Sequence, residues 1–140
     1  MSTFVIDASV AIKWVVNEPD TKQALSLRRH RLLAPDLLIA ECANILWKKV
    51  RRKELLQREA MVAAGLLSRS DIEFEPMIGI FKAATEMAIV LDHPPYDCCY
   101  LALADVHDCP FVTADEALVR KVRSADVPTN VAVLSAFGSA

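Results

Sequence analysis

Short apolar runs alternate with longer stretches of helical periodicity along the whole chain. The short runs predict strands at Thr3–Ile6, Leu32–Ala34, Ile72–Glu75, Pro110–Thr113 and Val131–Leu134. The longer stretches repeat their apolar residues with the spacing of one helix face. They predict helices at Ala8–Val16, Asp20–Arg29, Asp36–Lys53, Leu55–Leu67, Ile78–Leu91, Tyr96–Val106 and Ala114–Ser124.

This order of elements predicts an α/β fold. Strands separated by one or two helices need crossover connections, so the central sheet should be mainly parallel. A parallel sheet is covered by helices on both faces, which gives a three-layer α/β/α sandwich. Such sheets bind ligands at the carboxyl ends of their strands. The length of 140 residues suits a single domain, spanning 1–140.

Composition excludes several classes of protein. A chain that is 54% apolar and 24% charged is not a disordered tail. Its net charge of −2 excludes a polycationic nucleic-acid coat protein but leaves room for a local basic patch. We expect no membrane span, because no uncharged stretch approaches the roughly 20 residues required. The Gly-rich phosphate-binding motifs are also absent.

The cysteines and the N-terminus indicate the compartment. The four cysteines form no C-x-x-C pair, so a disulfide framework or a zinc site is not expected. The N-terminus has neither a basic region nor a long apolar run, and therefore does not resemble a secretory signal. We expect a cytoplasmic protein in a reducing compartment.

Two acidic residues follow predicted strands directly. Asp7 comes after Phe4-Val5-Ile6, and Asp115 comes after Phe111-Val112-Thr113-Ala114. Both should therefore lie at the ligand-binding edge of the sheet. Either residue, taken alone, is equally explained as a helix N-cap, for which Asp is favoured.

Two further acids lie in apolar surroundings. Glu41 is about one turn into the predicted helix Asp36–Lys53, and Asn44, three residues on, shares its face. Asp97 begins a helix that is apolar nearly all round. That helix should be buried, with Asp97 at its inward-facing start.

Four carboxylates in one pocket would repel one another. Two charges 4 Å apart cost about 1 kcal/mol in water and more in a cleft. Protonation or a bound cation relieves this repulsion. Carboxylate oxygens with retained waters are the ligands preferred by Mg²⁺ or Mn²⁺. The four acids that predict this site are Asp7, Glu41, Asp97 and Asp115.

These residues together resemble the PIN domain family, and within it the VapC-type toxins of bacterial toxin–antitoxin pairs. Phe4–Ser9 resembles the family's opening strand and first acid, and Pro35–Asn44 resembles its second motif. Tyr96–Ala104 resembles the third motif, with Asp97 as its acid. Val112–Asp115 resembles the fourth, with Thr113 as the hydroxyl. The resemblance extends from residue 4 to about 134, and implies a PIN-like fold.

The resemblance also implies a function, that of a metal-dependent endoribonuclease using Mg²⁺, with Mn²⁺ as the alternative. Asp7 and Asp97 would be the central ligands, and Glu41 and Asp115 would act through water or hold a second ion. The supporting residues Asn44, Thr113 and Ser9 would orient a water or a carboxylate. For Ser9, a simple helix-start hydroxyl is an equal interpretation. The implied partners are an RNA substrate, a cognate antitoxin and a second copy in a homodimer.

One strong cluster of positive charge occurs in the sequence. It includes Lys48, Lys49, Arg51 and Arg52, and a second group, Arg120 and Lys121, follows Asp115. These residues are candidates for contacts to RNA phosphates. The alternative is that they are the solvated ends of helices, where cations favour the negative end of the dipole.

Other functions are compared with this one. A PIN-like module that binds RNA or a protein without cutting is the main alternative, and the presence of all four acids argues against it. A receiver or a dehalogenase-type phosphatase would need further acids near Asp7, where the sequence has Ala8 and Ser9. His30, His93 and His107 are scattered, and are more typical of surface residues; His93, near Asp97, is the best catalytic candidate of the three.

Overall fold

A computed structural model describes residues 1–138, and its centre is a sheet of five parallel strands. The spatial order is β3-β2-β1-β4-β5. The strands are β1 (Thr3–Ile6), β2 (Arg31–Pro35), β3 (Glu73–Glu75), β4 (Phe111–Thr113) and β5 (Val131–Val133). All five predicted strands are therefore confirmed, and no bound differs from the predicted one by more than one residue.

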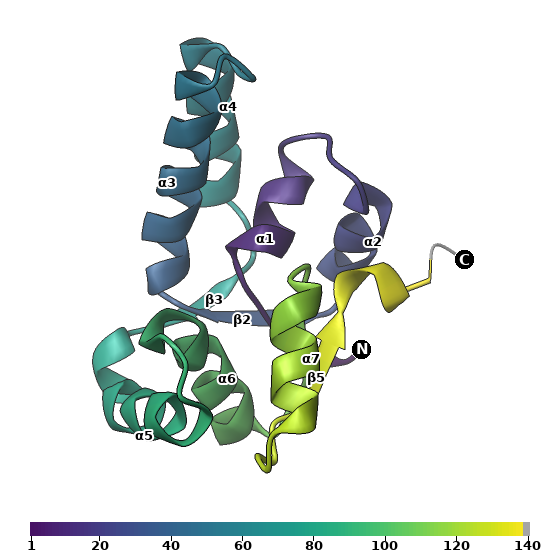
Figure 1. The fold of residues 1–140 in the computed structure, drawn as a ribbon. Coiled ribbons are helices and arrows are strands. Elements are labelled where there is room, and N and C mark those ends of the chain that lie inside the picture. Colours follow the sequence, from purple (N-terminus) through teal and green to yellow (C-terminus); the bar gives the residue numbers. More distant parts are fainter. Residues whose placement is uncertain (139–140) are drawn as a thin grey trace.

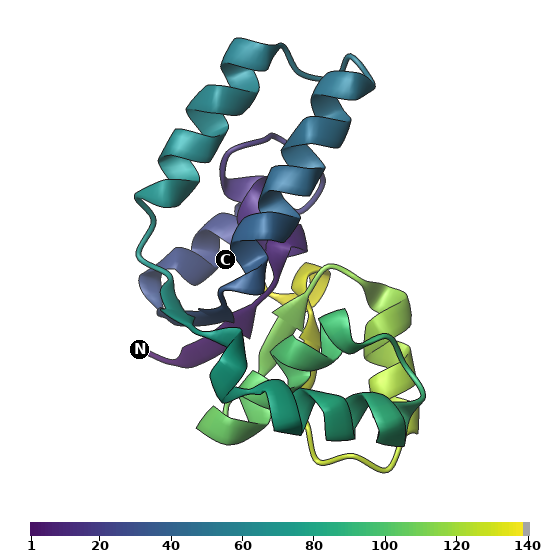
Figure 2. The same cartoon turned by 90° about the vertical axis from the view of Figure 1, so that its left-hand side faces the viewer.

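Helices cover both faces of this sheet. They are α1 (Ala8–Ala11), α2 (Thr21–Ser26), α3 (Leu37–Arg51), α4 (Gln57–Ser68), α5 (Phe81–Leu91), α6 (Pro95–His107) and α7 (Glu116–Ser124). Helices α1 to α4 lie on one side and α5 to α7 on the other, which confirms the three-layer α/β/α prediction (Figure 1). Helices α3 and α4 form a pair that extends away from the sheet (Figure 2). Within residues 1–138, no helix is both long and apolar enough to span a bilayer.

Several predicted helix bounds were wrong, and short 3₁₀ turns account for most of the differences. The segment predicted as Ala8–Val16 is α-helical only to Ala11, and continues as the 3₁₀ turn Ile12–Trp14. The segment predicted as Asp20–Arg29 likewise ends in a 3₁₀ turn, Leu27–Arg29. Such turns are frequent at helix ends, and their side chains follow nearly the same apolar pattern.

Two further helices start later than predicted. The segment Ile78–Leu91 opens with the 3₁₀ turn Met77–Gly79, so that α5 itself begins at Phe81. Helix α7 begins at Glu116 rather than Ala114, because Asp115 is its N-cap and its side chain accepts the backbone N–H of Leu118. A capping carboxylate fixes the start of a helix at the following residue.

Helix α6 is the central buried helix. Its residues Cys98 through Ala104 are all buried, and Tyr100 stacks on Phe111 of β4 with ring centroids 5.6 Å apart. A helix that is apolar all round has to be enclosed on every side. Helix α6 runs into β4, antiparallel to the strands, so its first turn, with Asp97, lies at their carboxyl edge.

The strand order reverses between β1 and β4. From β1 the chain continues to β2 on one side, and from β4 to β5 on the other. At this point the connecting helices diverge to opposite faces and leave a crevice at the carboxyl ends of the two strands. A ligand site is therefore expected immediately after Ile6 and Thr113.

Candidate active site

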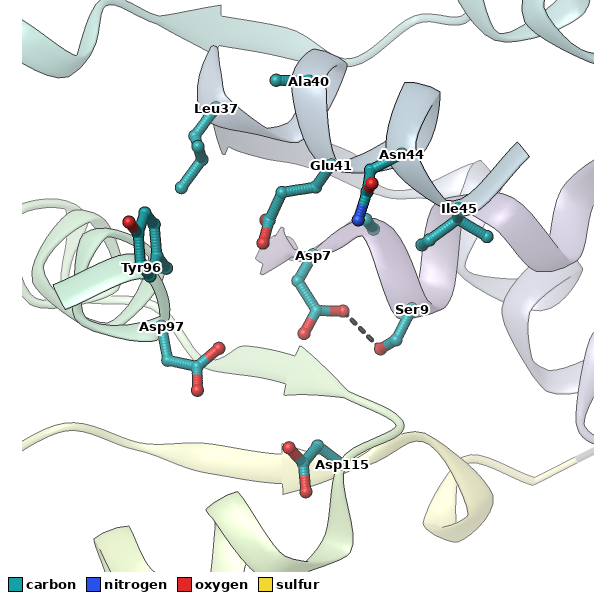
Figure 3. A pocket seen from close by; sticks show the side chains of 11 residues that line it. Asp7, Ser9, Leu37, Ala40, Glu41, Asn44, Ile45, Tyr96, Asp97 and Asp115 are labelled. Atoms are coloured by element: carbon teal, nitrogen blue, oxygen red, sulfur yellow. Dashed lines mark hydrogen bonds between the residues drawn. The ribbon is translucent and has the colours of Figure 1, made fainter. Parts of the chain in front are cut away.

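One cavity of about 440 Å³ lies at this reversal point. Four separate elements supply an acid to it: Asp7 after β1, Glu41 from α3, Asp97 from α6 and Asp115 after β4 (Figure 3). Ser9 and Asn44 also line it, whereas Thr113 is fully buried beneath. The structure thus brings together the seven residues predicted as catalytic or supporting.

Asp7 is the most buried acid of the site, and two hydroxyl groups hold it. Ser9 Oγ donates to one carboxylate oxygen at 2.5 Å, and Thr113 Oγ1 donates to the other at 2.6 Å. Both hydroxyls are themselves fixed, since the Ala114 N–H donates to Ser9 Oγ at 3.0 Å and the Asp115 N–H donates to Thr113 Oγ1 at 3.2 Å. The carboxylate is therefore clamped between the ends of β1 and β4.

The buried position of Asp7 disfavours its charged form, and its pKa shows this. Burial raises it from 3.8 to about 6, while the hydrogen bonds from Ser9 and Thr113 lower it and the charges of Asp97 and Glu41 raise it further. A carboxyl that is desolvated among like charges is stabilised by a proton or a cation. The site therefore favours the entry of positive charge.

Glu41 projects from α3 into the same cavity (Figure 3). Its carboxylate accepts a short hydrogen bond from the hydroxyl of Tyr100. Burial is the main cause that raises the pKa of Glu41, against the lowering effect of Tyr100. Burial and the carboxylate together raise the pKa of Tyr100, so the phenol stays a proton donor to Glu41.

Asp97 is held from the outer side of the cavity. The ring nitrogen Nε2 of His93 lies 2.7 Å from Asp97 Oδ2. The other nitrogen of that ring, Nδ1, lies 3.0 Å from Lys121 Nζ, which also donates to the carbonyl of Asp92 at 3.1 Å. An ammonium group only donates, so Nδ1 accepts, and Nε2–H donates to Asp97.

Asp115 combines two roles. One carboxylate oxygen accepts the Leu118 N–H at 3.1 Å as the cap of α7, and the side chain also lines the cavity. The cap interpretation and the site interpretation from the sequence are therefore compatible, because a carboxylate has about four lone-pair positions.

The six basic candidates occupy different surroundings. Lys48, Lys49 and Arg52 line a neighbouring cavity of about 330 Å³. The guanidinium of Arg51 lies over the ring of Trp47, 5.4 Å from its centroid. Arg120 is exposed on α7, and Lys121 is engaged with His93 and Asp92.

The donor set fits a hard divalent cation. Within residues 1–138 there is no group of three or more His, Cys, Asp or Glu side chains already arranged to hold an ion. Mg²⁺ usually keeps several waters and takes only one or two carboxylates directly, so a closed protein cage is not needed. Each of the four acids keeps lone pairs that its anchoring hydrogen bonds leave free.

Sequence reasoning missed two anchoring residues. Tyr100 follows Asp97 by three residues inside a buried helix, and a buried phenol needs a hydrogen-bond partner. That signal indicates some acceptor, although it does not identify Glu41. Lys121 was predicted to contact RNA, and its contact with His93 depends on how α7 packs beside the turn before α6.

Comparison with known proteins identifies the family. The PIN domain family model matches residues 4–123. The chain is 31% identical to ribonuclease VapC9 of Mycobacterium tuberculosis over 111 residues, 79% of this chain and 84% of that protein.

Solved structures show the same fold. A protein from Pyrobaculum aerophilum matches with a TM-score of 0.69 and 19% identity, over 96% of this chain and 90% of that one. VapBC2 from Rickettsia felis, bound to a DNA fragment from its promoter, matches with a TM-score of 0.68 and 11% identity, over 94% and 98%. The chain belongs to the PIN domain family, which confirms the resemblance found in its motifs.

Proposed function

We propose that this protein is a divalent-metal-dependent endoribonuclease and the toxin of a toxin–antitoxin pair. The observation that carries the proposal is that four acids from four separate elements line one cavity at the reversal point of a PIN-domain sheet. The ribonuclease activity named for the VapC9 relative supports it. The substrate is an RNA phosphodiester.

The acids have distinct tasks in this proposal. Asp7 and Asp97 would be the central ligands of Mg²⁺ or Mn²⁺, and Glu41 and Asp115 would hold it through water or hold a second ion. When bound, the ion supplies a water of lowered pKa and offsets charge on the phosphate. Ser9 and Thr113 hold the carboxylate of Asp7 in place, and Tyr100 does so for Glu41.

The proposed partners are an antitoxin protein and a second copy of the chain. VapBC2, a structural relative of this chain, is a complex bound to promoter DNA, which supports an antitoxin. The exposed apolar side chains Ile78, Phe81 and Ile89 support self-association through the segment around α5. All four cysteines are free, which supports a cytoplasmic location.

The experiment uses purified, antitoxin-free protein and total cellular RNA. Reactions contain Mg²⁺ or a chelator, and the new RNA ends are sequenced. We expect discrete cuts that require the metal. The Asp97→Asn protein should make none, because its amide removes one charge from the site while keeping the shape of the side chain and the surrounding fold.

The same experiment separates the alternative function. The alternative is a module that binds RNA or a protein without cutting. Normal cleavage by folded Asp97→Asn would contradict the catalytic assignment. No cleavage and no Mn²⁺ binding by the wild-type protein would favour the interaction module.

A further inference from the structure

A second cavity, of about 330 Å³, lies beside the acidic one. Four cationic side chains line it, together with one carboxylate, that of Glu18. We call it the basic groove and define it by Lys13, Lys48, Lys49 and Arg52. Its charge is opposite to that of the neighbouring site.

The basic groove and the acidic cavity share a wall. Ser9 and Ile45 line both of them. On α3 and at its C-cap, Ile45, Lys48 and Arg52 follow Glu41 by four, seven and eleven residues, which is the spacing of one helix face. The rise of an α-helix places Lys48 about 10 Å along the axis from Glu41, so the two cavities are consecutive along α3.

Two of the cations are fixed in position. The Glu18 carboxylate pairs with Lys49 Nζ at 3.0 Å and with Lys13 Nζ at 3.6 Å, and both lysine side chains are mostly buried. Lys48 and Arg52 are exposed and form no ion pair within residues 1–138. The groove therefore keeps a positive charge that Glu18 does not neutralise.

The helix dipole explains only part of this arrangement. Cations favour the C-terminal turn of a helix, which accounts for the charges at the end of α3. Lys13, however, comes from the 3₁₀ turn Ile12–Trp14, a different segment of the chain. Cations converge from two segments, next to an acidic cavity of opposite sign.

We propose that the basic groove binds the phosphodiester backbone of single-stranded RNA beside the bond to be cut. This inference rests on the proposed ribonuclease function. Lys48 and Arg52 contact phosphates directly, while Lys13 and Lys49, paired with Glu18 and Glu54, form the wall behind them. The RNA strand then follows α3 from the basic groove into the acidic cavity.

The test is RNA binding without cleavage. An end-labelled single-stranded RNA is titrated, in chelator, with Asp97→Asn protein over a range of salt concentrations. For single strands, the slope of log affinity against log salt falls by about 0.7 for each phosphate that the protein no longer neutralises. Lys48→Ala/Arg52→Ala should therefore reduce the slope by about 1.4. When the salt concentration is raised fourfold, the RNA affinity of both proteins should fall. The factor by which it falls should be about seven times smaller for this variant than for its parent.

A matched control uses two cations, one just past the end of α3 and one at the start of α4. Lys53→Ala/Arg58→Ala removes the same charge from exposed positions, and neither residue lines the basic groove. It should leave the slope near that of the parent. Equal reductions of the slope in both double variants, an unchanged slope in Lys48→Ala/Arg52→Ala, or no measurable binding would each overturn the inference. Failure of the proposed function is seen separately, as absence of Mg²⁺-dependent cleavage by the wild-type protein.

Discussion

His93 illustrates how a residue outside the four acids can hold one of the proposed metal ligands. Its Nε2 lies 2.7 Å from Asp97, and its Nδ1 lies 3.0 Å from Lys121. Because lysine can only donate, it selects the tautomer in which the ring donates to Asp97. A donor on one carboxylate oxygen orients the other oxygen toward the cavity, so we treat His93 as a positioning residue.

Removing this donor should weaken the site without unfolding the protein. We expect His93→Ala to reduce Mn²⁺ affinity or cleavage by about 10- to 100-fold, the usual effect of removing a residue that orients a metal ligand. His93→Gln should recover part of the activity, because its amide can donate in a similar direction. Calorimetric titration measures the Mn²⁺ affinity, and a cleavage assay measures the activity. A thermal melt checks that each variant is folded.

The control for His93 is another histidine. The ring of His30 packs edge-on against Phe4, with centroids 5.2 Å apart, and its Nδ1 accepts the backbone N–H of Ser2. His30→Ala should leave Mn²⁺ affinity unchanged. If His93→Ala also binds Mn²⁺ as the wild-type protein does, His93 does not position Asp97.

At the scale of single residues, the sequence predicts the acidic residues better than the residues that hydrogen-bond to them. Asp7 and Asp115 follow apolar strands, and that local pattern places them at the carboxyl edge of the sheet. The hydrogen bond from Tyr100 to Glu41 joins residues 59 positions apart. Its existence depends on the packing of α3 against α6, which local periodicity does not encode.

At the scale of elements, α3 connects the core, the site and the basic groove. It carries Glu41 into the acidic cavity, and Lys48, Lys49 and its C-cap Arg52 into the groove. A small cluster of Ile12, Leu46, Ala60 and Ala63 joins it to α4 and to the turn after α1. This cluster also positions the segment that carries Lys13.

Leu46 is the buried residue that α3 contributes to that cluster. We expect Leu46→Ala to lower the free energy of unfolding by about 2–4 kcal/mol, because it removes buried methyl groups and leaves a cavity. Leu66→Ala on α4, where the leucine is 48% exposed, should cost less than about 1 kcal/mol. Urea denaturation measures both.

Leu46→Val gives a smaller change at the same position, and remains informative if Leu46→Ala does not fold. A destabilisation by Leu46→Ala no larger than that by Leu66→Ala would show that this cluster does not join α3 and α4. A graded series would show that packing, rather than helix propensity, holds the two helices together.

Helices and strands were predictable where a single spacing of apolar residues dominated the sequence. All five strands and the long helix α3 follow from apolar spacing. The 3₁₀ turns Ile12–Trp14 and Met77–Gly79 were not separated from their helices, because three residues are too few to distinguish a period of 3.0 from 3.6. Nor does local spacing indicate that α3 and α4 extend beyond the sheet.

At the scale of the whole molecule, a net charge of −2 conceals two adjacent regions of opposite sign. The acidic cavity gathers four carboxylates, and the basic groove gathers four cations beside it. Composition excluded a uniformly basic protein but could not reveal this division, because it arises only when distant segments meet. The acidic cavity also lowers the free energy of unfolding of the metal-free protein.

Asp7 accounts for much of that destabilisation in the metal-free protein. Its pKa is raised from 3.8 to about 6 by burial, so the folded state binds this proton more tightly than the unfolded state does. The resulting stabilisation is complete below about pH 4 and is lost as the pH rises to about 6. The change corresponds to at most about 3 kcal/mol.

Asp7→Asn should therefore stabilise the metal-free protein by about 1–3 kcal/mol at pH 7.5, and by little at pH 4. Exposed Asp71→Asn, the control, should change neither value. Both comparisons use urea denaturation in chelator. An Asp7→Asn protein that is equally or less stable than the wild type at pH 7.5 would contradict the role of the buried charge.

At a saturating concentration of Mn²⁺, the wild-type protein should become more stable than the Asp7→Asn protein. A ligand that binds only the folded state at 100 times its Kd adds about 2.7 kcal/mol to the free energy of unfolding. The wild-type protein should gain about that much in Mn²⁺, whereas Asp7→Asn should gain little, because it lacks one of the two proposed central ligands. Equal gains in the two proteins would mean that the ion binds elsewhere. The reversal would show that a carboxylate which lowers the stability of the metal-free fold is a ligand of the cation.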